Sequence, residues 1–156
     1  MDINFTSPVR IINTAVLGAS FSIDDEAEEI GDFAALTISC TITDPDPNIP
    51  APNCKRILDI TCEWYENQES HRKTCEANCK LGIVVAYEQA LGYHLVQSEI
   101  DDYLNTQAIE IAYSKIRTYI EAMTAESPIG KFTLPVIDAG EYVRSIEAQQ
   151  MGRGQN

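Results

Sequence analysis

The side chains best suited to chemistry are five cysteines and two histidines, because thiolates and imidazoles bind zinc, form disulfides or act as nucleophile and base. The number of cysteines is odd, and no two of them form a C-x-x-C pair. Cys75 and Cys79 would lie about 13 Å apart along a strand, too far to share one zinc ion or one disulfide.

The neighbours of the cysteines indicate a structural role instead. Four of the cysteines, Cys40, Cys62, Cys75 and Cys79, alternate with apolar residues, as a side chain on the buried face of a strand does. We therefore predict reduced thiols in the core and no metal site at these positions: Cys40, Cys54, Cys62, Cys75 and Cys79.

The two histidines, His71 and His94, do not indicate nucleophilic catalysis, since no histidine–carboxylate–nucleophile pattern accompanies them. The sequence also lacks a P-loop, a dinucleotide fingerprint and a calcium-loop spacing. We predict a protein that is not an enzyme and that uses no cofactor.

The charge of the chain narrows the class of partner. A formal charge of −13 over 156 residues repels phosphate backbones and anionic lipid heads, so no nucleic acid is expected among the partners. No segment has the pattern of a signal peptide or the length of a membrane-spanning helix. These patterns predict a cytoplasmic protein without direct membrane insertion.

Two kinds of periodicity predict an α+β fold. Alternating hydrophobicity predicts four strands, and a proline-rich connection, "DPDPNIPAPN", separates the second from the third. The last two strands have matching alternation and are expected to pair as a hairpin, with one apolar and one polar face. The predicted strands cover Arg10–Ile23, Ala34–Thr43, Cys54–Glu66 and Arg72–Tyr87.

A long helix is predicted from Ser98, its expected N-cap, to about Thr124. Its apolar residues spread over an arc of about 200°, about twice what a helix covering one sheet needs. Either the helix is sunk between the sheet and the last helix, or it also forms an oligomer interface around a two-fold axis. The interface hypothesis names Ile109, Ile111, Ala112, Ile116, Tyr119, Ile120 and, from the fourth strand, Cys75.

An apolar loop follows the helix and carries "SPIGKFTLP". Asp138 and Glu141 then form a capping box at the start of a short last helix. We predict one domain over residues 1–150 and a disordered tail at 151–156.

This order of elements resembles the SecB family of export chaperones. In the long helix Ile111, Ala112, Tyr113 and Arg117 match the family's apolar-aromatic segment ending in arginine. In the loop Phe132, Leu134, Pro135 and Val136 match its leucine-x-leucine-proline type, and "TCEANCKLGIVV" resembles its fourth strand.

The resemblance implies an ATP-independent holdase, a dimer-of-dimers homotetramer built through the long helix, and long apolar grooves that bind unfolded client polypeptides. A charged rim around a groove of recessed apolar groups would let such a protein bind apolar client segments without aggregating itself. The expected groove residues are Ile129, Phe132, Leu134, Val136, Trp64, Tyr65 and Phe33.

Departures from the family pattern bear on the client. Ser114 replaces a proline-bearing aromatic segment, the segment after Pro135 is short, and the tail lacks the longer acidic ending that helps dock SecA. These departures favour the branch that serves toxin–antitoxin–chaperone modules, including some in phage defence, with an antitoxin as client. The alternatives are a general export chaperone that hands preproteins to SecA, and an oligomeric scaffold that does not chaperone.

Overall fold

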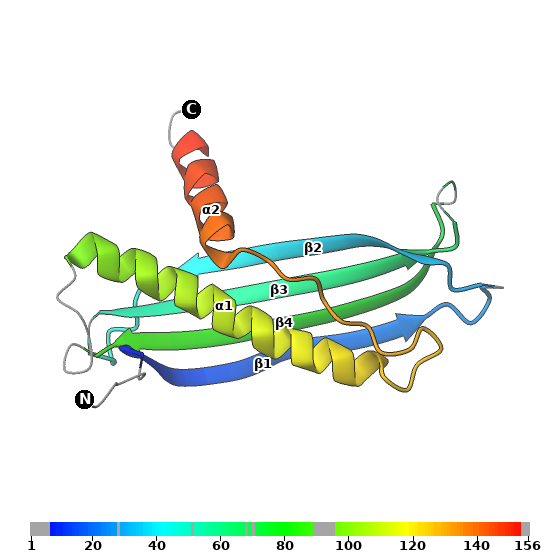
Figure 1. The fold of residues 1–156 in the computed structure, drawn as a ribbon, viewed down its shortest axis with the longest axis horizontal. Helices are drawn as coiled ribbons and strands as arrows, with labels where there is room; N and C mark the ends of the chain where they lie inside the picture. The colour runs from blue at the N-terminus through cyan, green and yellow to red at the C-terminus, as the bar shows by residue number, and fades with distance from the viewer. Residues whose placement is uncertain are drawn as a thin grey trace, which may run out of the picture.

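The computed structural model describes residues 7–27, 29–50, 52–67, 69, 71–88 and 96–153, and within them the predicted α+β fold is confirmed. Figure 1 shows four long strands, one long helix that lies across them and a shorter helix that extends outward past one edge of the sheet. The elements in chain order are β1 (Val9–Ile23), β2 (Asp32–Thr43), β3 (Asn53–Tyr65), β4 (Lys73–Tyr87), α1 (Gln97–Thr124) and α2 (Ala139–Arg153).

The four strands form one antiparallel sheet in the order β1-β4-β3-β2. The predicted hairpin of β3 and β4 is present, with Leu58 opposite Leu81 and Cys62 opposite Ala77. The remaining strands, β1 and β2, are therefore the two edges of the sheet. Each predicted strand boundary lies within two residues of the observed one.

Alternation along the two central strands separates a dry face from a wet face. On the dry face, the odd-numbered residues of β4 from Cys75 to Tyr87 are all buried, as are Leu58, Ile60, Cys62 and Trp64 of β3. The wet face of β3 and β4 carries mainly polar side chains; Asn78, for example, donates to Asp59 Oδ1 at 2.7 Å and to Thr61 Oγ1 at 2.9 Å. A sheet with one dry face needs a second layer on that side.

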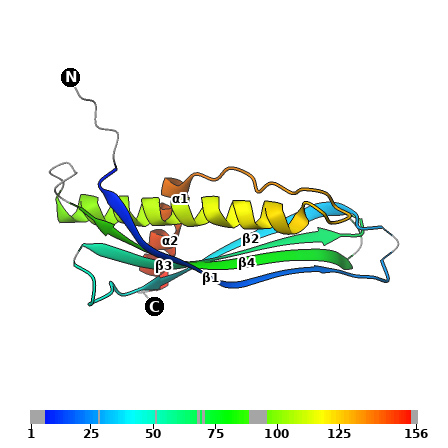
Figure 2. The same ribbon diagram turned by 90° about the horizontal axis from the view of Figure 1, so that it is seen from below.

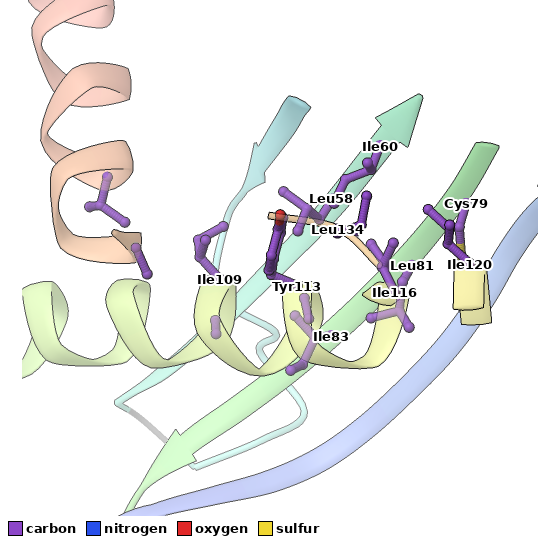
Figure 3. Packing of buried hydrophobic residues seen from close by; sticks show 14 of the residues in the cluster. Leu58, Ile60, Cys79, Leu81, Ile83, Ile109, Tyr113, Ile116, Ile120 and Leu134 are labelled. Carbon is purple, nitrogen blue, oxygen red and sulfur yellow. The ribbon is translucent and has the colours of Figure 1, made fainter. Parts of the chain in front are cut away.

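The second layer is α1, which lies along the dry face and packs chiefly on β4 and β3 (Figure 2). Figure 3 shows side chains from α1, β3, β4 and the segment after α1 meeting in one cluster. The helix begins at Gln97 rather than at a Ser98 cap, because the Glu99 carboxylate accepts the Val96 N–H at 3.1 Å. Neither helix in the described part of the chain is long and apolar enough to cross a membrane.

The short last helix is capped as predicted, since Asp138 Oδ1 accepts the Glu141 N–H at 2.9 Å. It runs on to Arg153, so residues 151–153 are helical and the predicted tail began too early. The physical reason is that Glu147 to Met151 are all good helix formers, with no breaker before Gly152. Residues 154–156 lie outside the described part of the chain.

The chain enters β2 through a crowded turn at Gly31. The backbone φ of Gly31 is 74°, and a Cβ there would lie 1.9 Å from the carbonyl oxygen of Tyr65. Beside it, the buried hydroxyl of Thr74 lies at hydrogen-bonding distance from the carbonyl oxygens of Ile30 and Trp64. The turn therefore requires glycine both for its φ and for the close approach of two backbone segments.

Gly31→Ala should lower the free energy of unfolding by about 3 kcal/mol, because it adds a steric clash to an unfavourable φ. The matched control is Gly130→Ala, since Gly130 has the same φ of 74° but open space around its Cβ position. The control should lose only about 1 kcal/mol in denaturant titrations. Equal losses at the two positions would contradict the crowded geometry of the first turn.

Candidate functional site

All five cysteines are free thiols, as predicted. Four are buried and Cys40 is half-buried, and burial raises the pKa of Cys62 to about 12 and of Cys75 to about 11. These thiols are protonated near neutral pH and are weak nucleophiles. Among the described residues no cluster of histidine, cysteine, aspartate and glutamate is placed to hold a metal ion. His71 is exposed, and His94 lies outside the described residues.

The candidate site is instead built by the segment that joins α1 to α2, residues 125–138, which we call the strap. Figure 1 shows the strap returning beside α1 across the sheet to the start of α2. At its beginning, the buried hydroxyl of Thr124 donates to the Ile120 carbonyl at 2.8 Å and accepts the Phe132 N–H at 2.8 Å. This one hydroxyl fixes the backbone at Phe132 relative to the end of α1.

Further along, the strap is anchored by Leu134 and Pro135. The Leu134 side chain is 1% exposed and fills the core, and the Tyr113 hydroxyl of α1 donates to the Pro135 carbonyl oxygen. Burial raises the pKa of Tyr113, so the phenol stays a donor. The strap is thus a packed part of the structure rather than a free loop.

The anchored strap places Phe132 against two aromatic residues of the sheet. The ring centroid of Phe132 lies 4.9 Å from that of Phe33 in β2 and 5.0 Å from that of Trp64 in β3. The ring centroids of Phe33 and Trp64 are 5.6 Å apart. We call these three residues the aromatic cluster. Trp64 is buried, whereas Phe33 is 40% exposed, so the cluster has a dry base and an accessible apolar surface.

Three of the seven expected groove residues, Phe33, Trp64 and Phe132, lie together in the aromatic cluster. Two more are accessible to different extents: Val136 is 84% exposed, and Ile129 is half-buried against the core. Two assignments were wrong. Leu134 is too buried to contact a partner, and Tyr65 lies on the wet face, where its hydroxyl donates to Glu63 at 2.7 Å, because neighbouring residues of a strand point to opposite faces.

The predicted oligomer interface is largely wrong as a list of residues. The side chains of Ile109, Ala112, Ile116, Ile120 and Cys75 are at most 2% exposed within one chain. The wide apolar arc of α1 is covered by its own sheet and by the strap, which sequence periodicity does not reveal. Of the proposed residues only Ile111, which is half-buried, and Tyr119, which is 44% exposed, are accessible.

The sequence analysis missed two accessible surfaces, the first of them apolar and the second lined by both apolar and polar residues. Edge strand β1 leaves Ile11 and Val16 46% and 43% exposed on the side of the sheet that carries α1. Between β2 and α2 lies a hollow of about 400 Å³, which we call the edge groove. It is lined by Ile38, Ser39, Cys40, Tyr142, Ser145, Ile146, Gln149 and Gln150. The alternation of β2 and the apolar side of α2 are the sequence signals that pointed there.

Comparisons with known proteins place the fold but not the family. No protein-family model and no curated protein matches the chain. Among solved structures, the chain is similar to the Mycobacterium tuberculosis SecB-like chaperone Rv1957, which was solved in complex with a ChAD peptide from the HigA1 antitoxin. The alignment has a TM-score of 0.51 and 17% sequence identity, and it covers 83% of this chain and 91% of that one. A Streptococcus agalactiae protein of unknown function aligns with a TM-score of 0.41 and 9% identity, over 82% and 97%. The first likeness establishes a SecB-like fold.

Thr124→Val should lower the free energy of unfolding by about 1–2 kcal/mol, because it leaves the Phe132 N–H without its acceptor. It should also change the fluorescence of Trp64, since Phe132 packs on that indole. The matched control is Thr118→Val, which removes an exposed hydroxyl that bonds only within α1, to the Ser114 carbonyl. If both variants left the fluorescence unchanged, Thr124 would not be the anchor of the strap.

Proposed function

We propose that this protein is a holdase: it binds unfolded or aggregation-prone polypeptide segments on the aromatic cluster, without nucleotide. The observation that carries the proposal is the exposure of Phe33 beside the buried Trp64 and the half-buried Phe132. An aromatic surface of this kind accepts many apolar side chains, because burial of apolar area is not directional.

The charge of the chain supports the same function. A surface that binds exposed apolar segments also risks binding copies of itself. A net charge of −13 opposes such self-association, and it favours clients that are neutral or basic. The aromatic cluster lies at the junction of sheet and strap.

For the client, we favour an antitoxin of a toxin–antitoxin–chaperone module over a preprotein bound for export. The SecB-like chaperone of similar fold is in complex with an antitoxin peptide. Two sequence departures from the export pattern support the same client: Ser114 in the long helix and the short segment after Pro135.

We further propose that copies associate through edge strand β1 and Tyr119, in the homotetramer that the resemblance to the SecB family implies. Ile11 and Val16 face the side of the sheet that carries α1, and α1 covers them only in part. Exposed aliphatic residues on a sheet edge are stabilised when a second copy buries them.

The holdase proposal predicts that Phe33→Asp lowers the ability to keep an unrelated, chemically unfolded protein from aggregating, by about tenfold in the concentration required. A charge at this position opposes burial of a client's apolar side chain. Light scattering without nucleotide measures the effect. The matched control, Met151→Asp, places the same charge on another exposed apolar residue, which is 73% exposed on α2.

The control should retain full activity, and both variants should remain folded by circular dichroism. If Phe33→Asp protected the test protein as well as the parent chain does, the aromatic cluster would not be the binding surface. If the parent chain gave no protection at near-equal concentration, the protein would be a scaffold rather than a holdase.

The assembly proposal predicts that Val16→Asp dissociates the oligomer, because it buries a charge in the proposed contact. The control is Leu17→Asp, in a residue that is equally accessible at 52% exposed but covers Gly82 on the opposite face of the sheet. Native mass spectrometry should show a tetramer for the control and smaller species for Val16→Asp. Dissociation by both variants, or by neither, would contradict a contact on the helix side of β1.

A further inference from the structure

The dry face of strand β3 carries one charged side chain, that of Arg56, which is half-buried. The remaining residues of this face are all buried and apolar: Cys54, Leu58, Ile60, Cys62 and Trp64. An arginine among such neighbours loses part of its hydration, and this loss is offset only when its charge meets an opposite one. The position of Arg56 therefore calls for an anionic partner.

The guanidinium of Arg56 is held in place, but its charge is unpaired. It donates to the carbonyl oxygen of Lys55 at 2.7 Å, to that of Thr43 at 3.4 Å, and to Asn105 Oδ1 of α1. Arg56 takes part in none of the ion pairs that the described residues form. Neutral oxygens thus fix the orientation of the guanidinium and leave its positive charge for a ligand.

Beside this guanidinium lies a hollow of about 270 Å³, which we call the arginine pocket. Figure 1 shows the start of α1 at the end of the molecule where β2 ends and β3 begins, and the pocket lies between these elements. The buried side chains of Cys54 and Leu104 give it an apolar floor. At about 30 Å³ for each water molecule, the hollow has room for a ligand of about nine non-hydrogen atoms.

The wall opposite the helix is fixed by Asn53, which is 7% exposed. Its amide nitrogen donates to the carbonyl oxygens of Asp46 at 3.1 Å and Ile49 at 3.2 Å, and its Oδ1 accepts the Asp46 N–H at 2.8 Å. These bonds tie the proline-rich connection to the start of β3 and hold Pro45 at the pocket. The pocket is therefore formed without a ligand, as small-molecule sites usually are.

The helix side of the pocket adds a negative charge and a neutral donor. Asp101 lines the pocket, and its Oδ1 accepts a hydrogen bond from Gln97 Nε2 at 3.0 Å. Asn105 Oδ1 accepts from Arg56 and from the Cys54 thiol, whose sulfur is 3.5 Å away. The Asn105 amide nitrogen donates to no described residue, so its N–H groups are available to a ligand.

We propose that the arginine pocket binds a free amino acid with an apolar side chain of leucine size. Its carboxylate contacts the Arg56 guanidinium and the Asn105 amide, and its ammonium group contacts Asp101. Its side chain packs on Cys54 and Leu104. A zwitterion suits the pocket better than a plain anion, because Asp101 and the net charge of −13 repel an anion. This inference does not rest on the proposed holdase function, since the aromatic cluster lies at the other end of β2.

An NMR titration of the full chain with leucine tests the proposal. The side-chain amide signal of Asn105 should shift and saturate, with a Kd of about 1 mM or tighter. Two analogues are the matched controls: 4-methylpentanoate lacks the ammonium group, and leucinamide lacks the carboxylate. Each should bind at least about tenfold more weakly, because each loses one charged contact. Equal binding of either analogue, or leucine without a saturable shift, would overturn the proposal.

Variants of the two charged residues locate the ligand. Arg56→Gln and Asp101→Asn should each weaken leucine binding by about tenfold. The controls are Lys55→Gln and Asp102→Asn, which change exposed neighbours that do not line the pocket and should bind leucine as the parent chain does. Asp101→Asn keeps an acceptor for Gln97, so it decides the question if Arg56→Gln does not fold. Unchanged binding by Asp101→Asn, or an equal loss in Asp102→Asn, would contradict the assigned site.

Discussion

The width of the sheet is the constraint on which the rest of the structure depends. Four strands spaced about 4.8 Å apart present a dry face roughly twice as wide as the 10 Å body of one helix. Helix α1 lies over the two central strands, where burial is nearly complete. Neither edge strand is covered to the same extent, so the fold must find other cover for β1 and β2 or leave their apolar residues accessible.

The strap resolves this constraint on the β2 side only in part. Leu134 closes the core over the central strands, and the Thr124 hydroxyl holds Phe132 against Trp64. Phe33 and the edge groove stay accessible because the strap reaches one end of β2 and α2 stands beside the other. On the β1 side, Ile11 and Val16 remain exposed. Incomplete cover of a wide sheet thus accounts for both surfaces to which we assign partners, the aromatic cluster beside β2 and the exposed residues of β1.

The sequence was most informative where burial follows a simple period. Alternation located the four strands and the dry side of β4, and capping chemistry located the start of α2 at Asp138. Periodicity was misleading where cover comes from another segment. The apolar arc of α1 correctly shows which residues are buried, but it does not show whether the same chain or a second chain covers them. Ile116 and Ile120 were assigned to an interface with a second chain, whereas they are buried within their own. Within the strap, only the fold separates the buried Leu134 from the clustered Phe132.

Trp64 is the single tryptophan of the chain and forms the base of the aromatic cluster, so its fluorescence reports directly on the central claim. The decisive measurement is a titration of the protein with a reduced, permanently unfolded polypeptide that lacks tryptophan. Binding on Phe33 predicts a change in Trp64 emission that saturates near stoichiometric ratio and that Phe33→Asp abolishes. Emission that stays constant while the polypeptide binds would place the client elsewhere and contradict the assignment of the aromatic cluster as the binding surface.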